Sequence, residues 1–349
     1  ARLSPDGSTL AILCAGQNTL YKENGSVDSA NSTQYLFLYD VADANKHQPK
    51  LIQVIKQTNA HVGLVWMPDG KTLYAAGGND DAVYAYTKSG ETWAQSAKIS
   101  LGHGGKGVGL NVQPNAGGLA ISPDGKTLVV ANNYNDSISV IDTATNKLRY
   151  EHDLRPYFSG NEGDGGKPGG TYPFAVAVKS VNVNKGEQDR TIAYVSANRD
   201  REVDVIDISS PTAGQLITRI KLDGNPLGMI LDASQKTLYV AQDNTDQVAV
   251  IDTKTNTVTD KIDTRAPTGT LRPVESPRSQ AGLTQTGSDN RGVGSDKARF
   301  TGASPIAVTL SPDGNTLYAV NDGANSIAVI PLSGGQAGKV SGLIPTAYA

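Results

Sequence analysis

One stretch of the chain, SPDGKTLVVANNYNDSISVID at 122–142, recurs in diverged copies from one end of the sequence to the other. Within it, two runs of alternating apolar and β-branched residues, at 127–131 and 137–142, flank a polar segment at 132–136. Alternation with a period of two residues predicts strands, and two such runs joined by a short polar segment predict a β-hairpin.

The turn before this hairpin and the run after it extend the unit to four strands. Ser-Pro-Asp-Gly at 122–125 predicts a tight turn, because proline presets φ and glycine accepts a positive φ. An apolar run at 119–122 leads into the turn, and 148–154 predicts a fourth strand. Five further copies share this plan: LSPDGSTLAIL, WMPDGKTLYAA, RTIAYVSANRD, LDASQKTLYVA and LSPDGNTLYAV.

Repeated four-stranded sheets constrain the fold strongly. Each sheet has two apolar faces that it can bury only against neighbours, and stacking around a ring also protects the strand edges. We therefore predict an all-β chain, a β-propeller of four-stranded blades with six repeats visible. Six blades can close a ring alone, but we favour seven, because residues 1–4 begin inside an inner strand and 345–349 lead toward another. We expect 1–349 to be a single domain and a fragment trimmed at both ends.

Composition narrows the classes of partner. The 31 lysines and arginines nearly balance the 34 aspartates and glutamates, which gives a net charge of -3. This balance offers no basic surface, and we expect no nucleic-acid partner. No apolar run approaches the roughly 18 to 20 residues of a membrane-spanning helix, so we predict no membrane span. The single cysteine, Cys14, excludes an internal disulfide, and its place at the end of a predicted strand suggests a core residue.

Long polar inserts interrupt the repeats mainly on one side of the expected ring. In a propeller, the loops that lead into inner strands and those that join second to third strands lie on one face, here called the insert-rich face. The Pro-Asp-Gly turns lie on the other, the PDG face. One smaller insert, 180–189, maps to the PDG face, and four large ones map to the insert-rich face: 16–34, 102–118, 155–173 and 264–304. Loops of this length are usually functional or disordered, so we predict a ligand or docking site on the insert-rich face. The alternative is that the inserts are solvated surface loops without a function of their own.

Few residues offer metal or acid–base chemistry. The aspartates of the Pro-Asp-Gly turns belong to separate blades, so we interpret them as turn residues rather than metal ligands: Asp6, Asp69, Asp124 and Asp313. Of four histidines, His61 at the start of an inner strand and His103 in an insert-rich-face loop could approach the channel. They are the first candidates for a general base, although a structural role is the simpler interpretation. A metal site needs three or more convergent ligands, and we predict neither a metal nor a cofactor.

A second group of candidates surrounds the expected channel mouth on the insert-rich face. Arg199 and Arg201, in the sequence NRDRE, could bind a carboxylate or phosphate, or could instead pair with Asp200 and Glu202. Residues that precede the proline of an inner strand should ring the channel. These are Tyr172, Asn225 and Ser304, and Asp243 completes the set of candidates.

Familiar catalytic and nucleotide-binding motifs are absent from the sequence. Gly107 follows Lys106 where a phosphate loop needs serine or threonine, and Glu162 and Asp164 lack the spacing of a calcium loop. No nucleophile elbow, HExxH run or Ser/His/Asp order is present.

The segments VVANNYNDSISVIDTATNKL and LYVAQDNTDQVAVIDTKTNTV resemble the YVTN-type β-propeller family, which includes YncE-like proteins. This resemblance covers nearly the whole chain apart from the inserts. The tail SGLIPTAYA further resembles bacterial proteins in which a YncE-like propeller is fused to an alkaline-phosphatase-superfamily phosphoesterase domain. These resemblances imply a seven-bladed propeller of an exported bacterial protein, periplasmic or extracellular, with any phosphoesterase metal ligands beyond Ala349.

Two functions are compatible with these features. Our first interpretation is a non-catalytic scaffold that binds a partner protein, an appended domain or an extracellular polymer through the insert-rich face. The alternative is a lactonase-like or other hydrolase with its site at the channel mouth, since the fold of this family also carries lactonases. Convergence of three or more of seven residues on one point would favour the enzyme: His61, His103, Glu162, Asp164, Arg199, Asn225 and Asp243.

Overall fold

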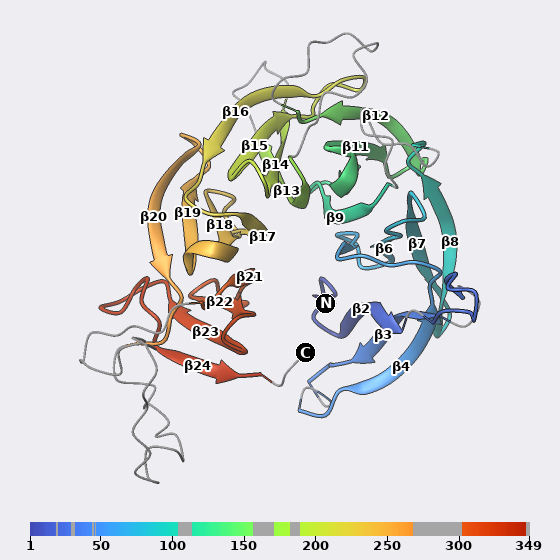
Figure 1. The fold of residues 1–349 in the computed structure, drawn as a ribbon, viewed down its shortest axis with the longest axis horizontal. Helices are drawn as coiled ribbons and strands as arrows, with labels where there is room; N and C mark the ends of the chain where they lie inside the picture. The colour runs from blue at the N-terminus through green and yellow to red at the C-terminus, as the bar shows by residue number, and fades with distance from the viewer. Residues whose placement is uncertain are drawn as a thin grey trace.

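The computed structural model of the chain describes residues 1–18, 20–28, 32–43, 45, 47–103, 114–155, 171–181, 189–267 and 302–346. The described strands form six antiparallel sheets of four strands, each built from consecutive segments of the chain. Figure 1 shows these sheets as blades around a central axis. The prediction of an all-β propeller with four-stranded blades is confirmed.

Each blade runs from its inner strand to its outer strand in chain order. Blade 1 contains β1 (Arg2–Leu3), β2 (Thr9–Asn18), β3 (Thr33–Asp40) and β4 (Lys50–Lys56). Blade 2 contains β5 (Leu64–Trp66), β6 (Thr72–Ala76), β7 (Ala82–Ser89) and β8 (Thr92–Ser100). Blade 3 contains β9 (Ala116–Ile121), β10 (Thr127–Asn132), β11 (Ser137–Asp142) and β12 (Lys147–Asp153).

The remaining three blades repeat the plan. Blade 4 contains β13 (Pro173–Val181), β14 (Arg190–Ala197), β15 (Glu202–Asp207) and β16 (Gln215–Lys221). Blade 5 contains β17 (Pro226–Leu231), β18 (Thr237–Gln242), β19 (Gln247–Asp252) and β20 (Thr257–Asp263). Blade 6 contains β21 (Pro305–Leu310), β22 (Thr316–Asn321), β23 (Ser326–Pro331) and β24 (Gly342–Pro345). Single 3-10 turns, η1 (Asn133–Asn135) and η2 (Asp243–Thr245), join the second and third strands of blades 3 and 5.

Alternating side chains explain why neighbouring blades pack together. In blade 3, Leu128 and Val130 of β10 pack in a cluster with blade 2, whereas Val129 and Ala131 pack with blade 4. All four residues are fully buried. Burying one valine or leucine side chain contributes roughly 1.5–3 kcal/mol. Both faces of a blade therefore help to hold the ring together.

The inner strands approach one another so closely that some positions accept only glycine. A Cβ atom on Gly228 of β17 would lie 2.9 Å from the carbonyl oxygen of Ile306 in β21. A Cβ atom on Gly118 of β9 would clash in the same way with the carbonyl oxygen of Phe174 in β13. These contacts are between backbones, so the neighbouring strand can yield only if the blades move apart.

The Pro-Asp-Gly turns use their aspartates as predicted, to close the turn. Ser122 Oγ donates to Asp124 Oδ1 at 2.6 Å, and the N–H of Lys126 donates to the same oxygen at 3.1 Å. In blade 6, the bonds from Ser311 and from the N–H of Asn315 lower the pKa of Asp313 to about 2. Asp6 and Asp69 accept the corresponding backbone N–H in their turns. Their interpretation as turn residues is confirmed.

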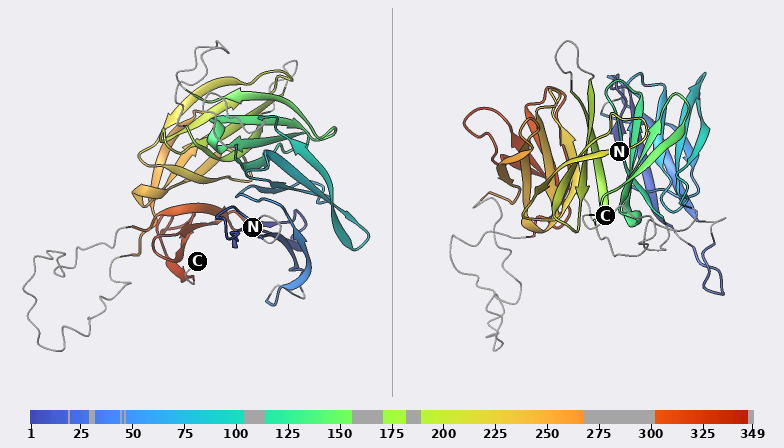
Figure 2. Two further views of the ribbon diagram at one scale, coloured as in Figure 1. Left: turned by 45° about the vertical axis from the view of Figure 1, so that its right-hand side comes forward. Right: turned by 90° about the horizontal axis from the view of Figure 1, so that it is seen from above.

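The strands run along the axis of the ring, so their ends form two faces (Figure 2). Turns between second and third strands contact the segments that lead into inner strands. The N–H of Asn133 donates to the carbonyl of Asn115 at 2.9 Å, and that of Asp243 donates to the carbonyl of Asn225 at 3.0 Å. Both kinds of segment therefore share the insert-rich face. Most residues of the inserts lie outside the described part of the chain, so their gathering on this face stays a prediction.

The ring is open between blade 6 and blade 1 (Figure 1). Ala11 and Leu36 of blade 1 pack against blade 2, so the alternate residues Ile12 and Phe37 face the opening, where they are only partly buried. Cys14 lies on this same face and is exposed, which corrects our expectation of a core residue. The reason is that no described blade covers that face. A seventh blade stays a prediction.

We expect Gly118→Ala to lower the free energy of unfolding by more than about 2 kcal/mol, because its Cβ would meet the backbone of β13. Gly342→Ala is the matched control, since a Cβ there has open space and the change should stay within about 0.5 kcal/mol. Thermal and chemical unfolding followed by circular dichroism measures both variants. Equal stability of the two would contradict the close approach of the inner strands.

Candidate functional site

Four of the predicted site residues form one continuous arc on the insert-rich face, across blades 4 and 5. This mouth arc consists of Tyr172, Arg199, Asn225 and Asp243. The guanidinium carbon of Arg199 lies 4.0 Å from the ring centroid of Tyr172, and the Tyr172 ring makes an edge contact with Tyr134 of η1 at 5.6 Å. A guanidinium stacked in this way keeps the N–H groups on its edge available for a ligand.

Hydrogen bonds between blades 4 and 5 fix the rest of the mouth arc. The side-chain amide of Asn198 donates to the carbonyl of Pro226 at 3.2 Å, and that of Asn225 donates to the carbonyl of Asn198 at 3.0 Å. The N–H of Asp243 in turn donates to the carbonyl of Asn225 at 3.0 Å. Asn225 therefore connects the turn that carries Arg199 to the turn that carries Asp243.

Asp243 stands where the two preceding blades carry an amide. By strand register it corresponds to Asn133 in blade 3 and Asn198 in blade 4. The Asn133 side chain donates to the carbonyl of Pro173 at 3.1 Å, so in both blades the amide binds the next blade. An ionised carboxylate has no proton to donate. Within the described part of the chain no hydrogen bond or ion pair engages the Asp243 side chain, which is partly buried.

Blade 6 continues this edge with Ser304 and a second carboxylate, Asp322. The N–H of Asp322 donates to the carbonyl of Ser304 at 3.1 Å, and the N–H of Ser304 donates to Asp246 at 3.1 Å. Asp322 occupies the repeat position of Asp243 but is exposed. Ser304 thus lies beside Asp322 of its own blade and is not hydrogen bonded to the four residues of the mouth arc in the described structure.

A repeated aspartate binds the chain on both sides of the large inserts. Asp246 is left-handed, with φ of 57°. Its carbonyl accepts the N–H of Thr264 before the insert, and its carboxylate accepts the N–H of Gly302 after it, both at 2.9 Å. Asp136 does the same for the insert after blade 3, binding the N–H groups of Leu154 and Tyr172. In blades 3 and 5, one residue therefore fixes where the insert leaves and rejoins the ring.

The acidic residue after Arg201, Glu202, binds other cations. Glu202 is 1% exposed and pairs with Arg219 Nη1 at 3.0 Å and with Lys221. Among the described residues, no ion pair joins either arginine to Asp200 or Glu202. The alternative interpretation of a surface ion-pair cluster therefore finds no support in the described structure.

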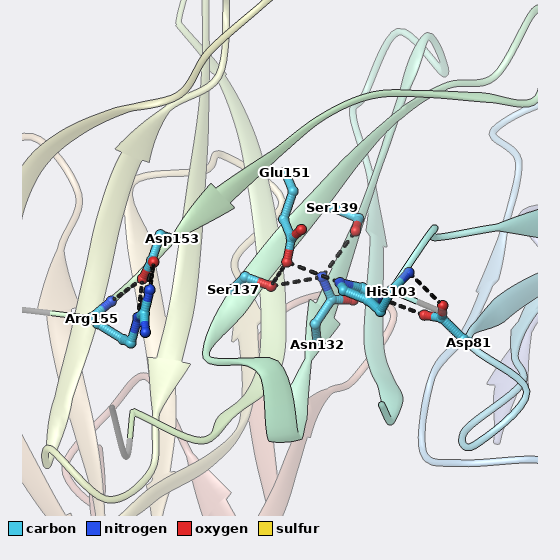
Figure 3. A network of polar contacts seen from close by, with 8 residues as sticks. All are labelled: Asp81, His103, Asn132, Ser137, Ser139, Glu151, Asp153 and Arg155. Carbon is cyan, nitrogen blue, oxygen red and sulfur yellow. Dashed lines mark hydrogen bonds and ion pairs between the residues drawn. The ribbon is translucent and has the colours of Figure 1, made fainter. Parts of the chain in front are cut away.

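His103 belongs to a buried polar network between blades 2 and 3 (Figure 3). Its side chain is 3% exposed, its Nδ1 faces Asp81, and its Nε2 lies 2.9 Å from Glu151 Oε1. Ser137 Oγ donates to Glu151 and has no contact with the imidazole in this network. A nucleophilic triad needs the base to contact the hydroxyl. The arrangement therefore does not activate Ser137.

The charge of His103 also argues against a role as a base. Burial lowers the pKa of His103, but the hydrogen bonds to Asp81 and Glu151 and the negative charges of these carboxylates outweigh it and raise the pKa to about 9. The imidazole is therefore a cation at neutral pH and donates from both nitrogens. It joins blade 2 to blade 3 and cannot accept a further proton.

The other predicted candidates do not add to the mouth arc. His61 lies against Gly117 of the neighbouring inner strand, and burial lowers its pKa. Arg201 is exposed, at the repeat position of Asp136 and Asp246. Glu162 and Asp164 lie outside the described residues. Among the residues that are described, no group of three or more His, Cys, Asp or Glu side chains is placed to hold a metal ion.

Sequence reasoning missed several residues that build this face. The missed residues lie after the second strand of a blade: Tyr134, Asn198, Asp246 and Asp322. Comparing the first position after that strand from copy to copy would have found Asn198 and Asp322, because this position changes from an amide in blades 3 and 4 to a carboxylate in blades 5 and 6. No helix in the described chain is both long and apolar enough to cross a bilayer.

Comparison with known proteins supports the fold. No protein-family model matches the chain. A seven-bladed beta-propeller protein of Mycobacterium tuberculosis is 32% identical over 161 residues, which cover 44% of this chain and 34% of that protein. The chain is a β-propeller. Hydrazine synthase subunit beta of Kuenenia stuttgartiensis is 28% identical over 222 residues, covering 61% of this chain and 52% of that subunit. The chain thus spans about a third to a half of the length of these curated relatives.

Solved propellers match this β-propeller over almost its whole length. A Bacteroides uniformis protein provisionally named 6-phosphogluconolactonase has a TM-score of 0.63 at 14% identity, covering 99% of this chain and 84% of its own. The periplasmic gluconolactonase of Pseudomonas aeruginosa has a TM-score of 0.59 at 16% identity, covering 98% and 83%. Virginiamycin B lyase of Staphylococcus aureus has a TM-score of 0.57 at 15% identity, covering 97% and 88%. Likeness at this level of identity establishes the fold alone.

These neighbours correct our first interpretation of function. We expected a non-catalytic scaffold, but the similar solved propellers include proteins named as lactonases, which fit the alternative of a lactonase-like hydrolase better. The scaffold was inferred from the absence of sequence motifs and from the long inserts. Neither the absence of motifs nor the presence of long inserts excludes a catalytic site that is assembled from single residues of several blades.

We expect the free energy of unfolding to fall by about 3 kcal/mol as the pH rises from about 6.5 to 9, because folded His103 keeps a proton that the unfolded chain releases. The contribution is complete below the unfolded pKa and is lost as the pH passes the folded pKa. His103→Gln should be less stable at pH 6 and should lack this part of the pH dependence. Denaturant unfolding of both proteins at several pH values measures the difference, and parallel pH profiles would contradict the charged imidazole.

Proposed function

We propose that this β-propeller is a lactonase-like hydrolase whose site is the mouth arc on the insert-rich face. The observation that carries the proposal is the carboxylate of Asp243, which replaces an amide that ties blades together elsewhere and gains no partner of its own in the described structure. The names of the structural neighbours favour a lactone over other substrates.

The chemistry assigns Asp243 the role of general base. A water molecule beside the carboxylate attacks the carbonyl carbon of a lactone, and its proton passes to Asp243. The ring C–O bond then breaks, and the departing alkoxide takes the proton back from Asp243, which gives the hydroxy acid and restores the carboxylate. Asn225 is a positioning residue, because it holds the backbone of Asp243 through its carbonyl. Asp322 is a weaker candidate, because it is exposed and lies outside the arc.

We expect Asp243→Asn to lower kcat for lactone hydrolysis by at least about 100-fold, the usual contribution of a positioned base. The new amide can donate to the next blade as Asn133 and Asn198 do, so stability should be unchanged or higher by about 1 kcal/mol. A pH-indicator assay on glucono-δ-lactone and a panel of γ- and δ-lactones, corrected for spontaneous hydrolysis, measures the first effect. Thermal unfolding measures the second.

Asp322→Asn is the matched control for this experiment. It makes the same chemical change at the same repeat position of the next blade, and we expect most of the activity to survive it. Wild-type protein that hydrolyses no lactone of the panel would overturn the proposed function. Full activity of Asp243→Asn would overturn the role of Asp243.

Other aspects of the protein stay predictions that rest on the sequence resemblances. These are membership of the YVTN-type, YncE-like family, a periplasmic or extracellular location, and a phosphoesterase domain in the full-length protein. A protein or polymer partner on the insert-rich face is likewise a prediction. None of them is needed for the chemistry assigned to Asp243.

A further inference from the structure

Arg199 and Arg201 differ from the other described arginines on the insert-rich face. Two arginines that follow an outer strand, Arg155 and Arg265, bind the aspartate two residues before them. Arg219 binds two carboxylates and a carbonyl. Arg199 and Arg201 are both exposed, and in the described chain neither has an acidic partner. Guanidinium groups without a protein anion are suited to bind one from solution.

The stacking of Arg199 prepares it for such a ligand. The guanidinium carbon of Arg199 lies 4.0 Å from the Tyr172 ring centroid. The backbone N–H of Arg199 donates to the carbonyl of Thr171 at 3.3 Å. Tyr134 supports the Tyr172 ring from the side. The side chain therefore loses little conformational freedom when it binds, and its planar edge matches two oxygens of a carboxylate or phosphate.

Arg201 contributes a second positive charge at the start of blade 5. Its repeat position holds aspartate in blades 3 and 5, where the carboxylate binds the backbone N–H at the start of the next inner strand. In blade 4 that N–H belongs to Asn225 and is bound by Asn244 Oδ1 at 2.9 Å. The backbone at this point is therefore satisfied without the side chain of Arg201, which is exposed two residues after Arg199.

Neighbouring carboxylates offset these charges only in part. Glu202 is engaged by Arg219 and Lys221. Asp200 lies between the two arginines in sequence, but its Oδ2 is buried and has no hydrogen-bond partner among the described residues. The carboxylate of Asp243 lies at the other end of the mouth arc, beyond Asn225. The two exposed cations therefore have only one carboxylate between them in sequence, and it is partly withdrawn from the surface.

We propose that Arg199 and Arg201 form a subsite for a phosphate or carboxylate group, so that the mouth arc prefers anionic lactones to neutral ones. This inference rests on the proposed function for the claim that the bound molecule is a lactone. The binding of the anion itself does not depend on it.

Calorimetric titration at low ionic strength tests the subsite with glucose 6-phosphate, glucuronate and uncharged glucose. We expect both anions to bind and glucose to bind at least 10-fold more weakly. Arg199→Gln should weaken anion binding by about 10- to 100-fold, the usual effect of losing a charge-assisted contact. Arg199→Lys keeps the charge without the planar fork and should be intermediate. A stronger effect on glucose 6-phosphate would identify phosphate as the preferred group, and a stronger effect on glucuronate would identify carboxylate.

Arg190→Gln is the matched control. Arg190 is a half-exposed arginine at the other end of β14, paired with Asp207, and its loss should leave binding unchanged. Equal affinity for all three probes, or equal effects of the Arg190 and Arg199 variants, would overturn the subsite. Anion binding that depends on Arg199 in a protein that hydrolyses no lactone would support the subsite and refute the proposed function.

Discussion

The structure depends on the packing of each blade between two neighbours. A four-stranded sheet with two apolar faces cannot be stable alone, and alternate side chains of β10 reach blade 2 on one side and blade 4 on the other. The glycine contacts at Gly118 and Gly228 bring the inner strands together near the axis. Because of this packing, turns that are far apart in sequence meet at one end of the channel.

Polar contacts complete the seams at the insert-rich end. In each seam, side chains from the second, third or outer strand of one blade bind the segment that leaves the outer strand of the blade before it. The bound groups are the side-chain oxygen of Gln57, the His103 imidazole, the carbonyls of Leu154 and Thr264, and the N–H of Gly224. Buried polar groups are costly unless they are paired, so these contacts fix how the blades are aligned. The mouth arc lies at this same insert-rich end, so the contacts between neighbouring blades also position its residues.

The sequence predicts the blades well because their signals are local. Turn residues and two-residue alternation lie within one copy of the repeat, and β10 and β11 follow the predicted strands closely. Contacts between blades are not encoded locally. Nothing near His103 in the sequence points to Asp81 or to Glu151, which lies 48 residues away, yet together these carboxylates raise the pKa of the imidazole. Cys14 was misjudged for the same reason, since its burial depends on a neighbouring blade.

The candidate site also combines local signals, which the sequence reveals, with contacts between blades, which it does not. Tyr172, Asn225 and Asp243 could be named from their places in the repeat, and the structure connects them through Asn198 and Arg199. The function could not be derived in this way, because a propeller carries many activities and the inserts drew attention away from single positions at the mouth. The decisive signal is the carboxylate of Asp243, because an amide at the same repeat position in blades 3 and 4 binds the next blade.

A crystal structure of the Asp243→Asn variant with a lactone bound tests directly whether the mouth arc is the site of hydrolysis. We expect a lactone over the mouth arc, with its carbonyl carbon about 3–3.5 Å from a water molecule held by residue 243. A lactone bound on the PDG face, in the opening between blades 6 and 1, or away from residue 243 would contradict it.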